Sequence, residues 1–189
     1  QRHVGGGHVL LAPSAQELVR RAEALLPAIA ARRDEADRLR NIPAETMAEI
    51  TAAGDTVKFI QASASSSVLN RVLAGGGLSA IYGTLSSNGR VWLVNPAGIL
   101  VGPGGTIDTA GFVASTLAVR NEDFLAGRLT FSGPGGEVIN QGTITTPAGG
   151  SVYLIGGSVS NESVAGVPGS GIINSPQGEV ILAAGQTVN

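Results

Sequence analysis

The sequence predicts a mainly β fold in which short strands wind into stacked coils, preceded by an α-helical N-terminal segment. Two observations predict this: composition changes sharply near Gly54, and the residues after it contain a strand-rich repeat. With 28 glycines, 43% hydrophobic and only 4% aromatic residues, the chain is typical of folds that turn often and bury small aliphatic side chains. Its 189 residues suffice for one domain with an appendage.

Residues 1–53 are rich in charge and poor in glycine. They hold seven arginines, seven carboxylates and three glycines, whereas the other 136 residues hold five basic residues, seven acidic residues and 25 glycines. A shift of this kind usually marks a domain boundary. We therefore expect a flexible tail at 1–13, a helical segment at 14–53 and a β domain at 54–189.

Capping and periodicity predict the first helix. Ser14 and Glu17 form a capping box, and apolar residues recur at helical spacing as far as Ala30. Pro27 should kink or split this helix, because proline lacks the amide that an interior helical position donates.

A second short helix is expected from Pro43 to Gly54. The Leu26-Pro27 pair, the arginine-rich middle and Ile42–Thr46 make residues 17–54 resemble the first helices of acyl-CoA dehydrogenase-type flavoproteins. Nothing that would bind flavin follows these residues, so no cofactor is expected.

The repeat is the strongest internal signal. Val138–Gln141 corresponds to Val159–Glu162 at an offset of 21 residues, and Gly142–Gly149 corresponds to Gly171–Gly178 at an offset of 29. The difference, 29 minus 21, is an eight-residue insertion at 163–170, whose composition is that of a surface loop.

Short strands accompany the repeat at Val57–Phe59, Val91–Leu93, Val152–Leu154 and Val180–Leu182. A strand-rich period of this length indicates a solenoid, because a coil buries its apolar face only when a neighbour stacks upon it. At about 21 residues per coil, the β domain would form roughly six coils.

Asn140 and Asn161 occupy matching places in the repeat. They form either an amide ladder at one corner of the solenoid or two ordinary turns.

Asn95-Pro96-Ala97-Gly98-Ile99-Leu100-Val101-Gly102 resembles the Asn-Pro-Asn-Gly-Ile motif of the haemagglutination-activity domain in the filamentous haemagglutinin family of two-partner-secretion exoproteins. The likeness continues on both sides, at Ser67–Val72, Ile81–Leu85, Asn88–Val94, Gly111–Leu117 and Asn121–Phe124. It extends over some 130 residues in consistent order and spacing, although Ala97 stands where the family has asparagine.

The resemblance implies a right-handed parallel β-helix that acts as the secretion domain of a large exported adhesin. Recognition by the periplasmic domains of an outer-membrane β-barrel transporter would precede folding at the cell surface. Adhesion to host-cell glycans or proteins would be a property of the full-length exoprotein. The implied secretion and folding motif consists of Asn70, Arg71, Asn95, Pro96, Gly98, Ile99 and Gly102.

Localisation follows from the resemblance rather than from composition. The chain would be secreted through the periplasm to the cell surface, with no signal peptide recognisable in these residues. The absence of cysteine fits export as well as the cytosol. The sequence contains no run of about 18 uncharged apolar residues, so no membrane-spanning helix is expected. A net charge of -2 with 14% charged residues gives no electrostatic indication of nucleic-acid binding.

Two other classes stay open: a carbohydrate-active β-helix, binding or cleaving polysaccharide, and a helical flavoprotein fragment. An enzyme would need clustered carboxylates or an arginine base, and the charged residues near the motif are scattered. They are Arg71, Arg90, Asp108, Arg120, Glu122 and Asp123. We expect no catalysis from them.

Metal and phosphate sites are not expected. His3 and His8 have no carboxylate or thiol partners nearby in sequence. Gly75-Gly76-Gly77 lacks the following Lys-Ser/Thr of a phosphate-binding loop and predicts an ordinary loop.

Overall fold

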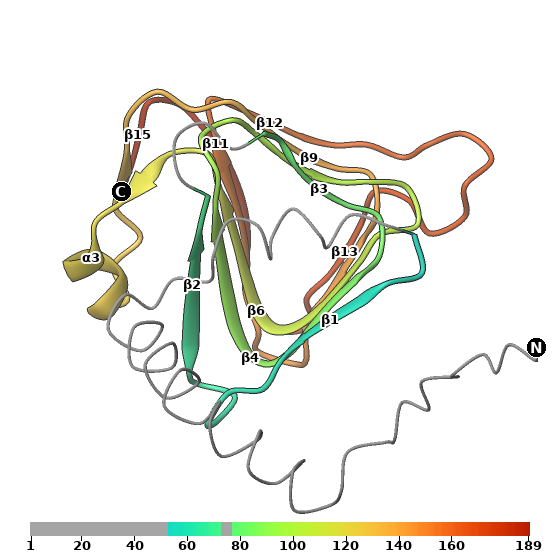
Figure 1. Ribbon diagram of the computed structural model, residues 1–189, viewed down its shortest axis with the longest axis horizontal. Coiled ribbons are helices and arrows are strands. Elements are labelled where there is room, and N and C mark those ends of the chain that lie inside the picture. The colour runs from blue at the N-terminus through green and yellow to red at the C-terminus, as the bar shows by residue number, and fades with distance from the viewer. Residues whose placement is uncertain (1–52, 73–76) are drawn as a thin grey trace, which may run out of the picture. The chain divides into compact units, whose positions relative to one another are not determined.

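A computed structural model describes residues 53–72 and 77–189 (Figure 1). The strands are β1 (Thr56–Phe59), β2 (Ser67–Arg71), β3 (Ser79–Ile81), β4 (Thr84–Val94), β5 (Ile99–Val101), β6 (Thr106–Ser115), β7 (Ala118–Val119), β8 (Phe131–Ser132), β9 (Glu137–Asn140), β10 (Thr143–Thr145), β11 (Val152–Gly156), β12 (Ser158–Asn161), β13 (Ile172–Asn174), β14 (Val180–Ala184) and β15 (Thr187–Val188). One short helix, α3 (Asn121–Leu125), lies between β7 and β8.

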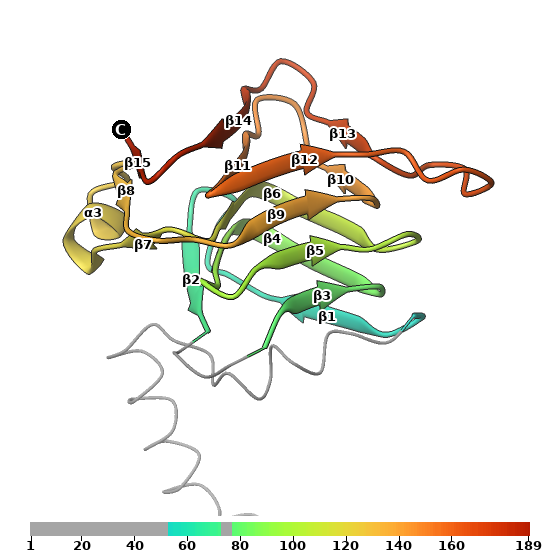
Figure 2. The same cartoon turned by 90° about the horizontal axis from the view of Figure 1, so that it is seen from above.

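The strands stack in parallel, coil upon coil (Figure 2). One face runs β1, β4, β6, β10 and β13; a second runs β2, β4, β6, β11 and β14; a third runs β3, β5, β9 and β12. These orders define five successive coils, and the expected parallel β-helix is confirmed. The expectation of six coils is wrong, because residues 116–136 leave the stack and form β7, α3 and β8 beside it.

The registers confirm the sequence repeat. Val138 pairs with Val159 at the offset of 21, and Thr143 pairs with Ile172 at the offset of 29. Val152 likewise pairs with Val180. Residues 163–170 lie in the loop between β12 and β13, which projects from the coils (Figure 1).

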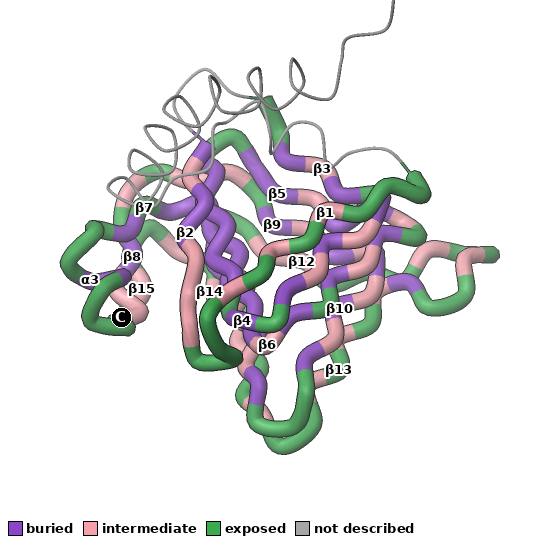
Figure 3. The backbone as a smooth tube through the Cα atoms, turned by 60° about the horizontal axis from the view of Figure 1, so that its bottom comes forward, coloured by how far each residue is buried: buried purple, intermediate pink, exposed green. Residues whose placement is uncertain are grey.

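The interior core is built from aliphatic columns that run from coil to coil. Leu85, Ile107 and Ile144 occupy one register position and are each 0% exposed. Figure 3 shows this buried lining inside the coils. The buried members of the interior core are Val72, Ile81, Leu85, Val91, Leu93, Ile99, Val101, Ile107, Phe112, Ala114, Val138, Ile144, Val152 and Leu154.

Glycines form a column at the corner that precedes the first face. Thr106 donates its backbone N–H to Gly83, Thr143 donates to Gly105, and Ile172 donates to Gly142. A Cβ added to Gly105 would lie 2.2 Å from the carbonyl oxygen of Ile81, so the coils can approach this closely only without side chains.

The long strand β4 passes from one face to the next through an irregularity between Ser87 and Arg90. Gln61 of the first coil fills this bend. Its Nε2 donates to Ser87 Oγ at 2.9 Å and to the carbonyl oxygen of Arg90 at 3.0 Å. Gly89 leaves the space that Gln61 occupies, since an added Cβ would lie 2.5 Å from Gln61 Cδ.

The amide ladder is confirmed at the corner between β9 and β12. Asn140 Nδ2 donates to Asn161 Oδ1 at 2.7 Å, and Asn161 Nδ2 donates to the carbonyl oxygen of Gly171 at 2.8 Å. Asn140 is 0% exposed and pairs with the aliphatic Val101 of the preceding coil. The corner therefore changes from aliphatic packing to amide hydrogen bonds partway along the stack.

Residues 116–136 form an excursion that packs on the outside of the second face. Phe131 of β8 stacks on Trp92 of β4 at 5.8 Å between ring centroids, and Phe124 of α3 meets the same indole edge-on at 5.2 Å. β8 also pairs antiparallel with β7 and β15. The buried members of this outer cluster are Leu69, Trp92, Val94, Val113, Leu117, Val119, Phe124, Phe131 and Ile155.

The last coil exposes part of its apolar interior. Val180 and Leu182 continue the core columns of Val152 and Leu154, yet they are 44% and 45% exposed because no described coil lies on them.

Several expectations fall on other parts of the chain. The tail at 1–13, almost all of the helical segment at 14–53, His3 and His8, and most of the Gly75-Gly76-Gly77 loop lie outside the described residues. Among the residues that are described, no helix has the length and apolar character needed to cross a membrane.

Candidate functional site

The Asn95-Pro96-Ala97-Gly98 segment forms a tight turn between β4 and β5. Gly98 donates its backbone N–H to the carbonyl oxygen of Asn95 at 3.1 Å, and Ala97 donates to Asn95 Oδ1 at 3.0 Å. The asparagine side chain thus caps its own turn, as asparagine does in Asx turns. Pro96 is exposed at the second position of the turn, where the fixed φ of proline matches the backbone geometry.

Asn95 also ties this turn to the coil before it. Its Nδ2 donates to the carbonyl oxygen of Gly77 and to Ser79 Oγ, both at 2.8 Å. Asn95 is 1% exposed, so these bonds satisfy a side-chain amide that water cannot reach.

The turn is bonded to the following coil through its backbone. Asn95 donates its N–H to Ser115 at 2.9 Å, and Gly136 donates to Pro96 at 3.0 Å. Gly136 ends the excursion, so one turn fixes both the return of the excursion and the stacking of three coils.

Residue 97 needs only a backbone amide here. The Ala97 side chain is exposed and its N–H makes the turn bond, which explains why alanine serves where the family has asparagine. Gly98 has a φ of 132°, a conformation that side chains disfavour, and an added Cβ would lie 2.7 Å from Leu78 Cδ1.

Ile99 and Gly102 follow the turn on the third face. Ile99 is 0% exposed and lies between Ser79 and Val138 of the neighbouring coils. Gly102 donates its N–H to Ile81 at 2.9 Å, and an added Cβ would lie 2.2 Å from the ring of Tyr82. Both residues therefore act in packing between coils.

The TPS secretion domain model matches residues 51–189, which include every coil described above. The chain belongs to the TPS secretion domain family. The predicted two-partner-secretion resemblance is thereby confirmed, and the secretion-domain interpretation is favoured over the carbohydrate-active one. The family model does not extend over the N-terminal region, and the relatives found give no support to the flavoprotein resemblance at 17–54.

Known relatives agree with the family match. The chain is similar to the crystal structure of the HMW1 secretion domain from Haemophilus influenzae, with a TM-score of 0.61 and 41% identity over 70% of this chain and 34% of that one. Two heme/hemopexin-binding proteins of Haemophilus influenzae are 45% and 43% identical over 60 residues, 32% of this chain. The match spans only 6% of the length of these curated relatives.

Asn70 and Arg71 of this TPS domain point to opposite sides of β2. Asn70 is 0% exposed and occupies the same interior register position as Leu93, with one long bond of 3.4 Å from Nδ2 to the carbonyl oxygen of Trp92. Arg71 turns outward and donates to Asn121 Oδ1 and to the carbonyl oxygen of Val119. Burial lowers the pKa of this guanidinium. Arg71 therefore attaches the excursion to the first coil.

The structure brings the predicted motif together only in part. Asn95 to Gly102 lies at one corner, whereas Asn70 and Arg71 lie on the second face and serve the interior and the excursion.

Some of the charged residues nearest the motif have structural partners of their own. Asp123, 2% exposed, accepts from Arg120 Nε at 2.9 Å and from Arg128 Nε at 2.8 Å. The Arg120 hydrogen bond, followed by that of Arg128, lowers the pKa of the Asp123 carboxyl. Glu122 and Asp108 are exposed.

Within the described ranges, no three His, Cys, Asp or Glu side chains gather in a way that could hold a metal ion.

Sequence reasoning missed the glycine corner and the outer cluster. The corner had a readable signal: Gly-Thr followed by Leu or Ile occurs at Gly83, Gly105 and Gly142, each at the start of a coil. The outer cluster had none of this kind, because Phe124 and Phe131 occur once and in no repeat.

Proposed function

We propose that this TPS domain directs export of a longer exoprotein to the cell surface, where it is the first part to fold and serves as the template for the rest. The family match carries the export role. The stacked coils support the templating role, since each coil offers the next a full row of backbone donors and acceptors.

The partner in export is an outer-membrane transporter, as expected for a TPS domain. We infer that its periplasmic domains bind the chain before the coils form, by adding an extended segment to a sheet edge. Once folded, every central strand of the second face, from β4 to β11, has neighbours on both sides and offers no free edge. On this face only the end strands β2 and β14 have a single described neighbour, so binding along the central strands requires the unfolded chain.

The motif at Asn95 couples export to folding in this proposal. It contributes hydrogen bonds to the coils on both sides, so folding past this turn fixes three coils together. Folding outside the cell would prevent the chain from sliding back through the transporter.

The experiment measures secretion and folding for Asn95→Asp, which keeps the shape and the Oδ1 acceptor but loses both Nδ2 donors. Losing these two bonds and placing a carboxylate oxygen against the carbonyl oxygen of Gly77 should together lower the free energy of unfolding by about 3 kcal/mol. We expect secretion to fall at least fivefold. The control is Asn88→Asp on the exposed bend, which has bonds only to Gln61.

Two results would contradict the proposal. Secretion unchanged by Asn95→Asp despite the loss of stability would show that folding does not drive export. Equal affinity of transporter periplasmic domains for the folded domain and for its urea-unfolded form would remove the recognition step.

A further inference from the structure

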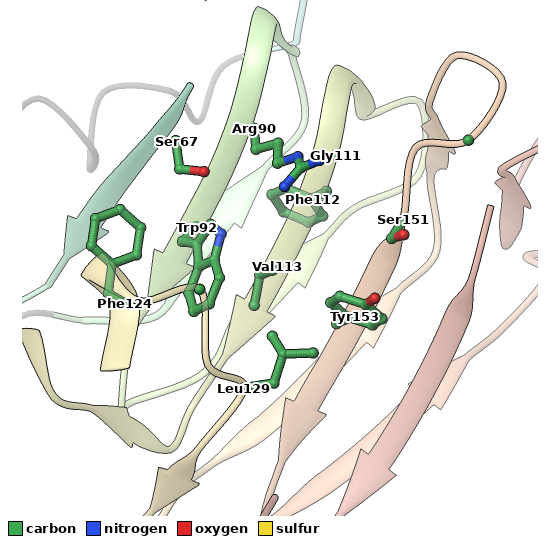
Figure 4. A pocket seen from close by; sticks show the side chains of 12 residues that line it. Ser67, Arg90, Trp92, Gly111, Phe112, Val113, Phe124, Leu129, Ser151 and Tyr153 are labelled. Atoms are coloured by element: carbon green, nitrogen blue, oxygen red, sulfur yellow. The ribbon is translucent and has the colours of Figure 1, made fainter. Parts of the chain in front are cut away.

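A pocket of about 300 Å³ opens between the second face and the excursion (Figure 4). Its floor comes from β4, β6 and β11, and its wall comes from α3 and the segment after it. Trp92, Phe124, Leu129 and Tyr153 give it an aromatic and aliphatic lining. Pockets of this volume hold small molecules of one ring or two.

Arg90 is the one charged residue among those that line the pocket. It forms no ion pair with another residue of the described segments. Gly111 lies beneath its stem, where an added Cβ would come within 3.2 Å of Arg90 Cγ. The glycine therefore lets the arginine lie flat across β6 at the pocket.

The polar groups beside Arg90 can donate hydrogen bonds. The indole nitrogen of Trp92 is on the side of its ring that faces Arg90 (Figure 4), and within the described residues it has no hydrogen-bond acceptor. Ser67 and Ser151 add hydroxyl groups to the lining. Tyr153 donates its hydroxyl to the Glu179 carboxylate at 2.7 Å.

A cation and an indole donor at one end, with aromatic rings along the floor, match a ligand that carries a carboxylate on a flat apolar body. We propose that this pocket binds a small aromatic carboxylate, with its carboxylate on Arg90 and its ring packed against the pocket side of Trp92, Phe124 and Leu129. This site is separate from the motif at Asn95, and its existence does not depend on the export role.

The test uses the full chain and its single tryptophan, Trp92, as the reporter. The probe is 3-phenylpropionate, titrated against tryptophan fluorescence excited at about 295 nm, where the probe does not absorb. We expect a saturable change with half-saturation at about 1 to 10 mM, given the binding energy available to so few atoms. The uncharged 3-phenylpropionamide and ringless acetate should each bind at least tenfold more weakly.

Arg90→Gln should weaken binding of 3-phenylpropionate at least tenfold. Lys58→Gln removes the same charge from the exposed side of β1, on another face, and should change affinity less than twofold. Far-ultraviolet circular dichroism checks the fold of both variants.

The proposal is overturned if the carboxylate gives no saturable signal up to 50 mM, or if the amide binds as well as the acid. Equal affinity of Arg90→Gln and the unsubstituted protein would overturn it too. If Arg90→Gln does not fold, the comparison of acid with amide on the unsubstituted protein still decides. Secretion is not measured here, so failure of this site leaves the export role untouched.

Discussion

The interior core and the outer cluster stabilise the same coils in different ways. In the interior, like residues stack, as with Leu85, Ile107 and Ile144, so each contact joins a coil only to its neighbours. The outer cluster instead draws on strands of every coil, from Leu69 in the first to Ala183, which packs against the cluster, in the last.

This difference indicates which contacts make unfolding of the coils cooperative. A stack of neighbour contacts alone can fray coil by coil, as in other solenoids. The excursion is bonded to both ends of the stack. Near its start, the carbonyl oxygen of Val119 accepts from Arg71 of the first coil, and near its end, Gly133 donates its N–H to Gln186, which follows the last coil. We therefore regard the excursion as a brace that makes five coils unfold together.

The largest effect should come from closing the glycine corner with Gly142→Ala. Its Cβ would lie 2.3 Å from the carbonyl oxygen of Gly105, a backbone atom that cannot move without separating two coils. We expect a loss of about 4 kcal/mol or a failure to fold. Urea unfolding measures it. Gly185→Ala, whose Cβ would meet nothing closer than 3.6 Å, should stay within about 0.5 kcal/mol.

The next test separates the two regions. Ile144→Ala and Phe131→Ala each remove a side chain that is 0% exposed, and each should cost about 3 to 4 kcal/mol. Urea unfolding is followed by Trp92 fluorescence and by far-ultraviolet circular dichroism. If the excursion is a brace, both signals shift together in both variants. A Phe131→Ala protein that loses the fluorescence transition early but keeps the circular dichroism midpoint would show that the excursion is merely attached.

These regions also differ in how far the sequence predicts them. The repeat predicted the register of β9 with β12 and of β10 with β13, because stacked coils place like residues at like positions. The ladder of Asn140 and Asn161 followed from the same alignment. The excursion was not predicted, since contacts such as Trp92 with Phe131 join residues 39 apart that no period relates.

The motif was predicted as residues but not as geometry. The resemblance singled out Asn95, yet its bonds to Gly77 and Ser79 depend on which residues the coils bring above and below the turn. That placement is set by loop lengths throughout the stack, which local sequence does not reveal.

A smaller effect is expected at the amide ladder. Asn161→Ala removes the acceptor for Asn140 Nδ2 and one donor to Gly171, on an exposed residue where water can replace part of both bonds. We expect a loss of about 1 kcal/mol in urea unfolding. A double-mutant cycle with Asn140→Leu, which copies the aliphatic corner of Val101, measures the coupling; additive effects would mean that the ladder bond contributes nothing.

The smallest effect, and one that depends on pH, should appear within the brace at Asp123. Arg120 and Arg128 lower the pKa of its carboxyl in the folded protein, so the unfolded chain binds a proton more readily. The ion pairs therefore stabilise the protein above the unfolded pKa of about 4, and this contribution is lost as pH falls through the lower folded pKa. The side chains of Arg120 and Arg128 are 73% and 54% exposed, so solvent screens the ion pairs and keeps their contribution to stability small.

Asp123→Asn should accordingly have a lower Tm than the unsubstituted protein at pH 7. The difference in Tm between the two proteins should narrow steadily below pH 4. A difference in Tm that stays constant from pH 7 to pH 2 would assign the effect to packing. The control is Glu122→Gln, on the exposed side of α3, which should show no comparable difference in Tm at pH 7 or at pH 2.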